Sequence, residues 1–540
     1  MKPGFERRRP IPEIEISRET TYVTGPLRED GYVDYVAAMN RFYSQGVTPE
    51  NNAVVPLWRA VGPKCLDTSI RKRYFELLGI AELPERGDYL LPLSECESLR
   101  NAYDLPNDAT DLDQRWRQAN ERFTRIGQRP WSRRELPDVA ALLDGNAKPL
   151  QTLIDGLGRP RFYSPSVCAS ADPFDMPFST STIESAREAL LQLRARAMLR
   201  LWEDDLDGAW QDIMAGYRLA RLCAQGPFNV DRLVSFTLEG IAARGAVAMS
   251  MTEGISAARA RKCQMDMHGL PAMPPLRRSV NVGERFWQLN FLLKAAVCGK
   301  RWESEFGGED ETLREALDEA DPQRKKRAET WNRLVEEEVD WSEAFRQYNA
   351  WHDRRAAAFD HATWSECIEE LTALDEEGRA HAEESLDLAA PDEPSPAPEM
   401  SPEDRARCLV GILVGAVGVL GTCLLTSEQK RQVYCDMMNV AIALAGYRSD
   451  HGTYPNCLEQ LRFQYIADVP LDAFSNDDLH YEREGDGYLL YSVGPNGVND
   501  GGRNFYEEFE NCSELESATE EERARDDIAI RTPTTRDGAK

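Results

Sequence analysis

An uncharged apolar stretch near the end of the chain constrains the fold more than any other feature of the sequence. Residues Leu409–Leu425 carry no charged side chain and, as an α-helix, would extend about 26 Å. No helix breaker follows this stretch, and apolar residues continue at intervals of three or four from Val433 to Tyr447, until Gly452 ends the pattern. The sequence therefore predicts one long helix that is apolar in its first half and amphipathic in its second.

Two settings suit the apolar half of this helix. Its length is at the lower limit for crossing a hydrocarbon core about 30 Å thick, and Gly411 and Gly415 form the G-x-x-x-G spacing that suits close helix contact in lipid. Basic residues such as Arg405 and Lys430 flank both ends, so charge gives no orientation. The alternatives are a membrane contact through Leu409–Leu425 and a helix that packs against the front part of the chain in one body.

The rest of the chain divides by composition. Its 540 residues exceed what one hydrophobic core usually supports, so we expect more than one packed unit. Apolar residues at helical spacing predict a helical hairpin at 183–226, which resembles a tetratricopeptide unit without a second copy at that repeat's period. The expected segments are a basic, extended arm at 1–19, a mainly α-helical region at 20–388, a linker rich in proline and acid at 389–404, and an α+β domain at 405–540.

Behind the long helix, the sequence changes to the pattern of a small sheet. Two alternating runs rich in tyrosine, Leu479–Arg483 and Tyr488–Val493, flank a Gly-Asp-Gly turn and predict a β-hairpin. The expected fold class is therefore α+β. A large, mainly helical N-terminal region precedes a C-terminal domain in which the long helix packs on a small antiparallel sheet.

The order of motifs in this tail resembles a known family. The apolar helix, then Ala443–Pro455, Val469–Phe474 and Tyr488–Gly497, resemble the major pseudopilin of type II secretion systems over about a quarter of the chain. The front region, through Thr20–Leu27 and Gly46–Ala53, resembles a group of uncharacterised planctomycete-type envelope proteins that carry the same tail. These resemblances imply a pseudopilin-like C-terminal domain and a cell-envelope location, membrane-associated or facing the periplasm.

The resemblance also implies a calcium site. Pseudopilins of this type bind calcium in the loop after the last long strand, which corresponds here to the chain between Gly494–Gly497 and Asp527–Ile528, with an acidic insertion at 507–522. Calcium takes 6 to 8 oxygen ligands, and carboxylates, amides and a glycine-bent backbone can supply them. The alternative is a glycine-rich turn whose Asn and Asp side chains bond their own backbone. The candidate calcium ligands are Asn496, Asn499, Asp500 and Asp527.

No motif in the sequence announces catalysis. The six histidines form no H-E-x-x-H, the twelve cysteines form no C-x-x-C pair, and neither a G-x-S-x-G elbow nor a P-loop is present. A formal charge of -28 without a basic stripe argues against nucleic acid as a partner. The start of the chain is basic but lacks the apolar stretch of a signal peptide, so we expect none there.

We expect a non-enzymatic envelope scaffold or interaction protein with protein partners, and calcium as its one cofactor. The alternative is an enzyme of unknown class with a cleft among the helices between Ile183 and Trp364. Converging titratable side chains in a deep pocket would favour the enzyme, and an apolar groove would favour the scaffold.

Overall fold

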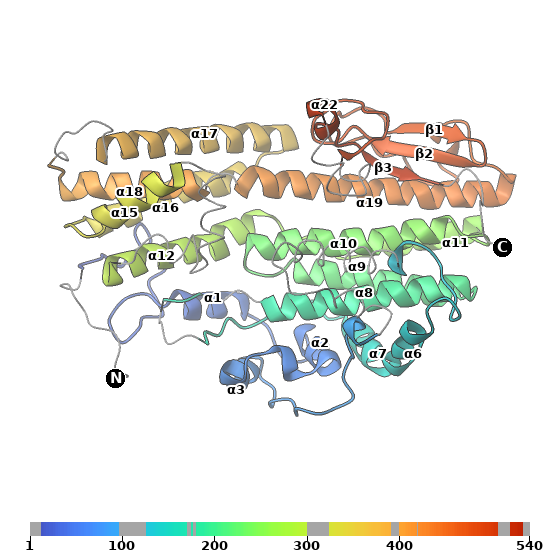
Figure 1. The fold of residues 1–540 in the computed structure, drawn as a ribbon, viewed down its shortest axis with the longest axis horizontal. Coiled ribbons are helices and arrows are strands. Elements are labelled where there is room, and N and C mark those ends of the chain that lie inside the picture. Colours follow the sequence, from blue (N-terminus) through green and yellow to red (C-terminus); the bar gives the residue numbers. More distant parts are fainter. Residues whose placement is uncertain are drawn as a thin grey trace.

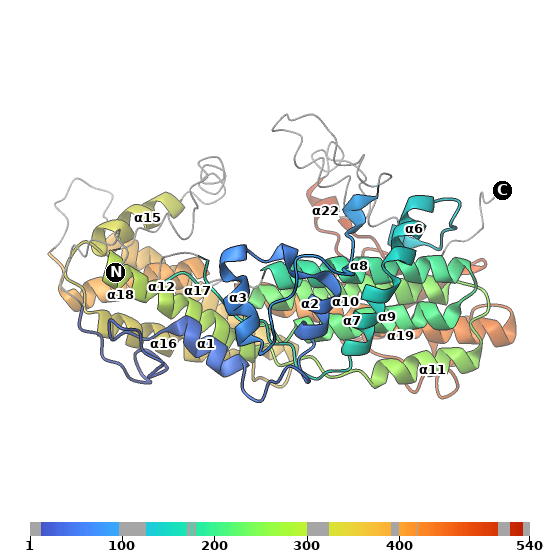
Figure 2. The ribbon, with the colours of Figure 1, turned by 90° about the horizontal axis from the view of Figure 1, so that it is seen from below.

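The computed structural model describes residues 12–96, 126–169, 174–176, 180–299, 323–389, 399–417, 420–505 and 519–532. The helices are stacked in layers along the longest axis of the molecule (Figures 1 and 2). The helices are α1 Tyr35–Tyr43, α2 Val54–Val61, α3 Thr68–Leu77, α6 Pro137–Gly145, α7 Ala147–Gly156, α8 Thr180–Trp202, α9 Leu206–Cys223, α10 Asn229–Ser250, α11 Ala257–His268, α12 Arg285–Cys298, α15 Gln323–Leu334, α16 Trp341–Ala358, α17 Trp364–Ala389, α18 Pro402–Val417, α19 Leu420–His451 and α22 Glu520–Arg523. The strands are β1 His480–Glu484, β2 Gly487–Ser492 and β3 Ile528–Arg531, and short helical turns lie at Pro63–Cys65, Leu93–Glu95, Ser279–Glu284 and Leu458–Leu461.

Three long helices, α8, α9 and α10, form the centre of the front region. The hairpin at 183–226 corresponds to α8 and α9, which pack against each other, and α10 packs on both. α9 begins after Asp205, whose carboxylate accepts the N–H of Gly208 at 2.9 Å and caps the helix. A Cβ atom on Gly216 of α9 would lie 3.2 Å from the Cβ of Ala242 on α10, so the glycine lets the two helices approach closely.

The predicted long helix is formed by α18 and α19, which lie on one line in Figure 1. From Pro402 to His451 this helix is long and apolar enough to cross a membrane, and 71% of its most apolar window is buried within the protein. α17 and α16 pack along α18, whereas α10 and α11 pack along α19. Both halves of the helix therefore have protein neighbours along their length, and membrane contact through Leu409–Leu425 stays a prediction.

A three-stranded antiparallel sheet of order β1-β2-β3 lies over α19 (Figure 1). The predicted hairpin is confirmed, with His480 opposite Tyr491 and Glu484 opposite Gly487. β3 pairs with the other edge of β2, and the sequence did not predict it. The many helices and this sheet confirm the α+β class, whereas the pseudopilin-like identity of the tail stays a prediction.

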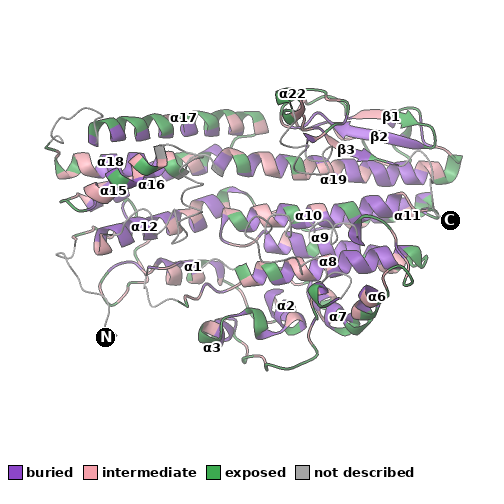
Figure 3. Cartoon of the chain, viewed as in Figure 1, coloured by how far each residue is buried: buried purple, intermediate pink, exposed green. Residues whose placement is uncertain are grey.

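One apolar core joins the front region to the tail. Its buried members include Met198 and Tyr217 from α8 and α9, and Leu444 and Leu490 from α19 and β2. Each of α8, α9, α10 and α19 carries buried residues along its length in Figure 3. The second half of the long helix is therefore part of the front region's packing as well as of the tail's.

Some predicted boundaries lie partly outside the described residues. α17 ends at Ala389 and α18 begins at Pro402, so the predicted linker 389–404 overlaps both helices, and 390–398 is not described. The predicted arm 1–19 is described from residue 12. Most of the predicted acidic insertion at 507–522 also lies outside the described residues.

Candidate functional site

The candidate calcium loop leaves β2 and returns to β3. Its glycines adopt positive φ angles, which non-glycine residues rarely adopt. At Gly494 a Cβ atom would lie 2.2 Å from the carbonyl oxygen of Asp526, so only glycine fits there. The glycines concerned are Gly494, Gly497, Gly501 and Gly502.

Asp527 is the deepest of the predicted ligands. Its side chain is fully buried, and its Oδ2 accepts the N–H of Gly502 at 2.7 Å and that of Asp500 at 3.1 Å. Its Oδ1 has no hydrogen-bond partner within the described part of the chain. Burial raises the pKa of this carboxyl to about 6, although the N–H of Gly502 opposes the change. A buried carboxylate oxygen without a partner is costly, and a bound cation would satisfy it.

Asn496 and Asn499 form Asx turns, as in the alternative to a calcium role. Asn496 Oδ1 accepts the N–H of Val498 at 2.7 Å, and Asn499 Oδ1 accepts the N–H of Gly501 at 2.9 Å. Local backbone geometry therefore accounts for both side chains without a metal ion.

The loop brings three of the four predicted ligands together. Asn496 Nδ2 donates to the carboxylate of Asp500 at 3.1 Å, and the backbone of Asp500 donates to Asp527. The amide oxygen of Asn499 is used elsewhere, since it also accepts the hydroxyl of Tyr491 at 3.1 Å.

Sequence reasoning missed Asp526, which lies beside this group. Its Oδ1 accepts the N–H of Asn496 at 3.3 Å, and burial raises the pKa of its carboxyl while Lys430 opposes the change. The sequence signal that could have identified Asp526 is its position beside Asp527 in an acidic pair directly before β3. Across the described ranges, no group of three or more His, Cys, Asp or Glu side chains is arranged to hold a metal ion. A calcium ion would therefore have to draw Asp500 and Asp526 toward Asp527.

Asp472 ties this loop to a second motif of the tail. Its buried carboxylate accepts the Ser492 hydroxyl at 2.8 Å and the N–H of Val493 at 2.9 Å, and also caps the turn at Phe474. Two of the segments that carry the pseudopilin resemblance, Val469–Phe474 and the end of β2, are thus in direct contact.

A groove separates the candidate calcium loop, at Asn504 and Asp526–Asp527, from the front region. It has a volume of about 350 Å³ and lies between α10, α19 and the chain entering β3. Asp526 and Asp527 line one wall, whereas Arg244 and Lys430 line the helical walls. Charged side chains therefore line both sides of the groove, together with apolar ones such as Phe236 and Ile528.

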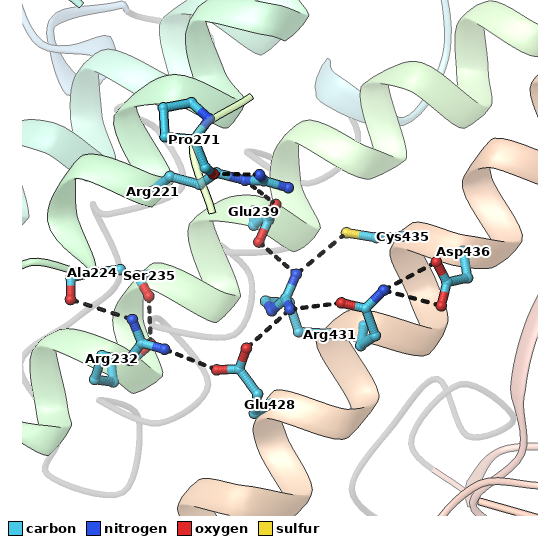
Figure 4. Close-up of polar contacts among 11 residues, drawn as sticks. Arg221, Ala224, Arg232, Ser235, Glu239, Pro271, Glu428, Arg431, Cys435 and Asp436 are labelled. Atoms are coloured by element: carbon cyan, nitrogen blue, oxygen red, sulfur yellow. Dashed lines mark hydrogen bonds and ion pairs between the residues drawn. The ribbon is translucent and has the colours of Figure 1, made fainter. Parts of the chain in front are cut away.

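Beside this groove, buried charges join α19 to α9 and α10 (Figure 4). Arg431 donates to Glu239 at 3.1 Å and to Glu428 at 2.9 Å. Arg232 donates to the other oxygen of Glu428 at 3.0 Å, and Arg221 donates to the other oxygen of Glu239 at 3.1 Å. We call these five residues the buried ion network: Arg221, Arg232, Glu239, Glu428 and Arg431.

Burial and pairing compete within the buried ion network. Burial acts against the charge of Arg431, but Glu239 and Glu428 beside it hold the pKa of its guanidinium above the ordinary value. Burial lowers the pKa of Arg232, and its pairing with Glu428 opposes that effect. For both arginines, the neighbouring carboxylates therefore oppose the cost of burying the charge.

A second groove runs along α18 between α16 and α17. Its volume is about 410 Å³, and its apolar lining includes Trp351, Leu388, Val410 and Val414. Exposed or half-buried charged side chains such as Glu384 surround it. Its lining therefore combines apolar side chains with titratable ones, among them Arg354, Glu377 and His381.

Comparison of the chain with protein-family models, with curated proteins and with solved structures gave no match. The function therefore has to be argued from the geometry described above.

Proposed function

We propose that this protein is a non-enzymatic scaffold of the cell envelope, in which the helical front region carries a pseudopilin-like tail as a binding or assembly module. The observation that supports this proposal is the long helix α18–α19. It is apolar enough to cross a membrane, it packs along the front region, and the small sheet covers its second half. This is the order of elements on which the pseudopilin resemblance depends.

The apolar part of the groove along α18 supports a binding role. Trp351, Leu388 and Val414 offer apolar surface, and Arg354 and Glu377 beside them are paired with each other at 2.7 Å. Such a lining suits a partner's apolar side chains, because burying them is favourable and needs no reacting group.

We further propose that the loop before β3 binds calcium. The unpartnered Oδ1 of Asp527, with Asp500 and Asp526 close by, supports an oxygen-ligated cation there. When bound, calcium would neutralise the repulsion among these carboxylates and hold the loop against the end of β3.

The scaffold proposal is tested by fractionation and affinity purification of the tagged, full-length protein from its native host. We expect the protein in the envelope fraction with co-purifying proteins, and we expect Leu388→Glu in the α18 groove to lose those partners. Leu91→Glu is the matched control, because Leu91 is an exposed leucine, 55% accessible, that does not line the groove. Recovery outside the envelope fraction, or equal partner sets for both variants, would refute the proposal.

The calcium proposal is tested by thermal unfolding of the full-length protein in calcium and in chelator. We expect calcium to raise the melting temperature of the wild-type protein and to leave Asp527→Asn unchanged, since binding to the folded state stabilises it. A flat response of the wild-type protein discards the site.

A further inference from the structure

α17 covers the apolar face of α18 by an interface of small residues. A Cβ atom on Gly411 would lie 2.2 Å from the hydroxyl oxygen of Ser385, and one on Gly415 would lie 2.4 Å from the Cβ of Ala382. A Cβ atom on Gly378 would lie 3.0 Å from Val414. The G-x-x-x-G spacing of α18 is therefore used inside the protein, with α17 as its partner.

The outer face of α17 differs from the face that covers α18. Acidic side chains are exposed along it, so this helix covers an apolar surface and presents a charged one (Figure 3). They include Glu366, Glu369, Glu370, Glu376, Glu383, Glu384 and Asp387.

The hold of α17 on α18 lacks the charges that fix the rest of the long helix. Within their described residues, no ion pair joins α17 to α18. The start of α18 is tied instead to the segment before α16, where Arg405 pairs with Glu337 at 2.6 Å and donates to the carbonyl of Glu338 at 2.8 Å. By contrast, the buried ion network fixes α19 to α10, so α19 stays attached to α10 if α17 leaves α18.

The free energy gained when α17 covers α18 depends on whether water or lipid surrounds the helices. In water, α17 removes the apolar face of α18 from solvent, which is favourable. In a lipid bilayer that gain vanishes, because lipid tails cover the same face equally well. The charged outer face of α17 would then favour the membrane surface over the interior.

We propose that α17 is a removable sheath and that the face of α18 beneath it contacts a phospholipid bilayer once α17 moves away. This inference rests on the envelope setting proposed above and adds the switch that controls membrane contact. The movement breaks contacts of α17 with α16, where Arg354 pairs with Glu377 at 2.7 Å, and with α19, where the hydroxyl of Thr422 donates to Asp375 at 3.4 Å. The sheet and the buried ion network stay in place.

A single substitution can lock the sheath. The side chain of Ser385 on α17 lies beside the buried thiol of Cys408 on α18, so Ser385→Cys places two thiols close together for a disulfide. The full-length variant is compared in oxidised and reduced form by flotation with phosphatidylcholine vesicles, which carry no net charge to repel this acidic chain. Wild-type protein and Ser385→Ala, treated with the same oxidant, control for disulfides among the other cysteines.

We expect wild-type and reduced S385C to float with the vesicles, and oxidised S385C to fall to the level of the vesicle-free control. Gly415→Leu, which crowds Ala382, is expected to float more than wild type while its circular dichroism stays helical. Equal flotation of locked and reduced protein overturns the proposal, as does a folded Gly415→Leu variant that floats no more than wild type. Lock-sensitive self-association without flotation would assign the face to a second copy and overturn the bilayer.

Failure of this inference differs from failure of the proposed function. If the protein is found in the envelope fraction but floats equally with and without the disulfide, the scaffold proposal stands and the sheath proposal fails. If the protein is absent from the envelope fraction but the disulfide abolishes flotation, the sheath proposal stands and the scaffold proposal fails.

Discussion

The two halves of the long helix are held by opposite means. α18 is held because side chains are missing, since Gly411 and Gly415 let α17 approach to van der Waals contact. α19 is held by large charged side chains, since Arg431 and Glu428 enter the buried ion network. The comparison teaches that close approach fixes the distance between helices, whereas buried charges also fix which residues stand opposite one another.

These two means differ in what they cost to disturb. Removing one partner of a buried ion pair leaves the other charge without water or a counter-charge, which is strongly unfavourable. Adding a methyl group to a close helix contact forces the backbones apart, which costs less and is partly relieved by movement. We therefore expect the α19 half to be the more sensitive to substitution.

The largest effect is expected at Glu239. Glu239→Ala leaves Arg221 and Arg431 buried without their shared carboxylate, and we expect a loss of about 3 to 5 kcal/mol in the free energy of unfolding. Urea unfolding of the full-length protein measures this loss. Glu377→Gln, which breaks the more exposed pair with Arg354, is the control and should cost about 1 kcal/mol or less. Similar losses for both variants would show that burial does not make the α19 pairs more costly to break than an exposed pair.

The next effect concerns the glycines of α18. Gly415→Ala places a methyl group 2.4 Å from the Cβ of Ala382, so we expect a loss of about 1 to 3 kcal/mol. The same urea experiment measures it. A loss as large as that of Glu239→Ala would show that the two halves are equally rigid.

The pH dependence of stability tests the candidate calcium loop, which lies beside the sheet over α19. Because burial raises the pKa of Asp527 to about 6, above its value in the unfolded chain, the folded protein holds this proton more tightly. Stability without calcium should therefore fall by about 1 to 2 kcal/mol as pH rises from about 4 to about 6, and stay lower above that. Asp527→Asn should remove this contribution.

Asp486→Asn is the control for that titration. Asp486 is exposed in the turn between β1 and β2, and no change in the pH profile is expected. The measurement is the denaturation midpoint in chelator at a series of pH values. A profile of Asp527→Asn that matches wild type would place the titration elsewhere.

The smallest effect reverses the sign of the glycine experiment. A Cβ atom on Gly240 of α10 would meet nothing within 4 Å, so Gly240→Ala should raise the free energy of unfolding by about 0.5 to 1 kcal/mol through helix propensity. Thermal unfolding beside Gly415→Ala tests whether packing, and not residue type, separates the two positions. A destabilised Gly240→Ala would contradict that explanation.

Sequence reasoning found the features that depend on local spacing. The unbroken apolar and amphipathic pattern from Leu409 to Tyr447 predicted the long helix, and alternation around Gly485–Gly487 predicted the hairpin. Asx turns at Asn496 and Asn499 were also predictable, because each side chain bonds a backbone group two residues away.

Features that join distant segments could not be found in this way. Arg232 and Glu428 lie 196 residues apart, and each resembles an ordinary surface charge on its own helix. Likewise, Gly415 indicated a close helix contact but not its partner on α17. β3 escaped notice because four residues after an acidic stretch carry too little alternation to predict a strand.

The core that α19 shares with α8, α9, α10 and α11 bears on how such a chain can evolve. If recombination exchanged the tail at the boundary near 389–404, the incoming helix would pack against front helices whose side chains fit a different α19. The tail is therefore not an independent domain that can be moved between proteins without changes elsewhere. Successful exchanges would have to carry matching changes in the front helices, so the two parts are expected to diverge together.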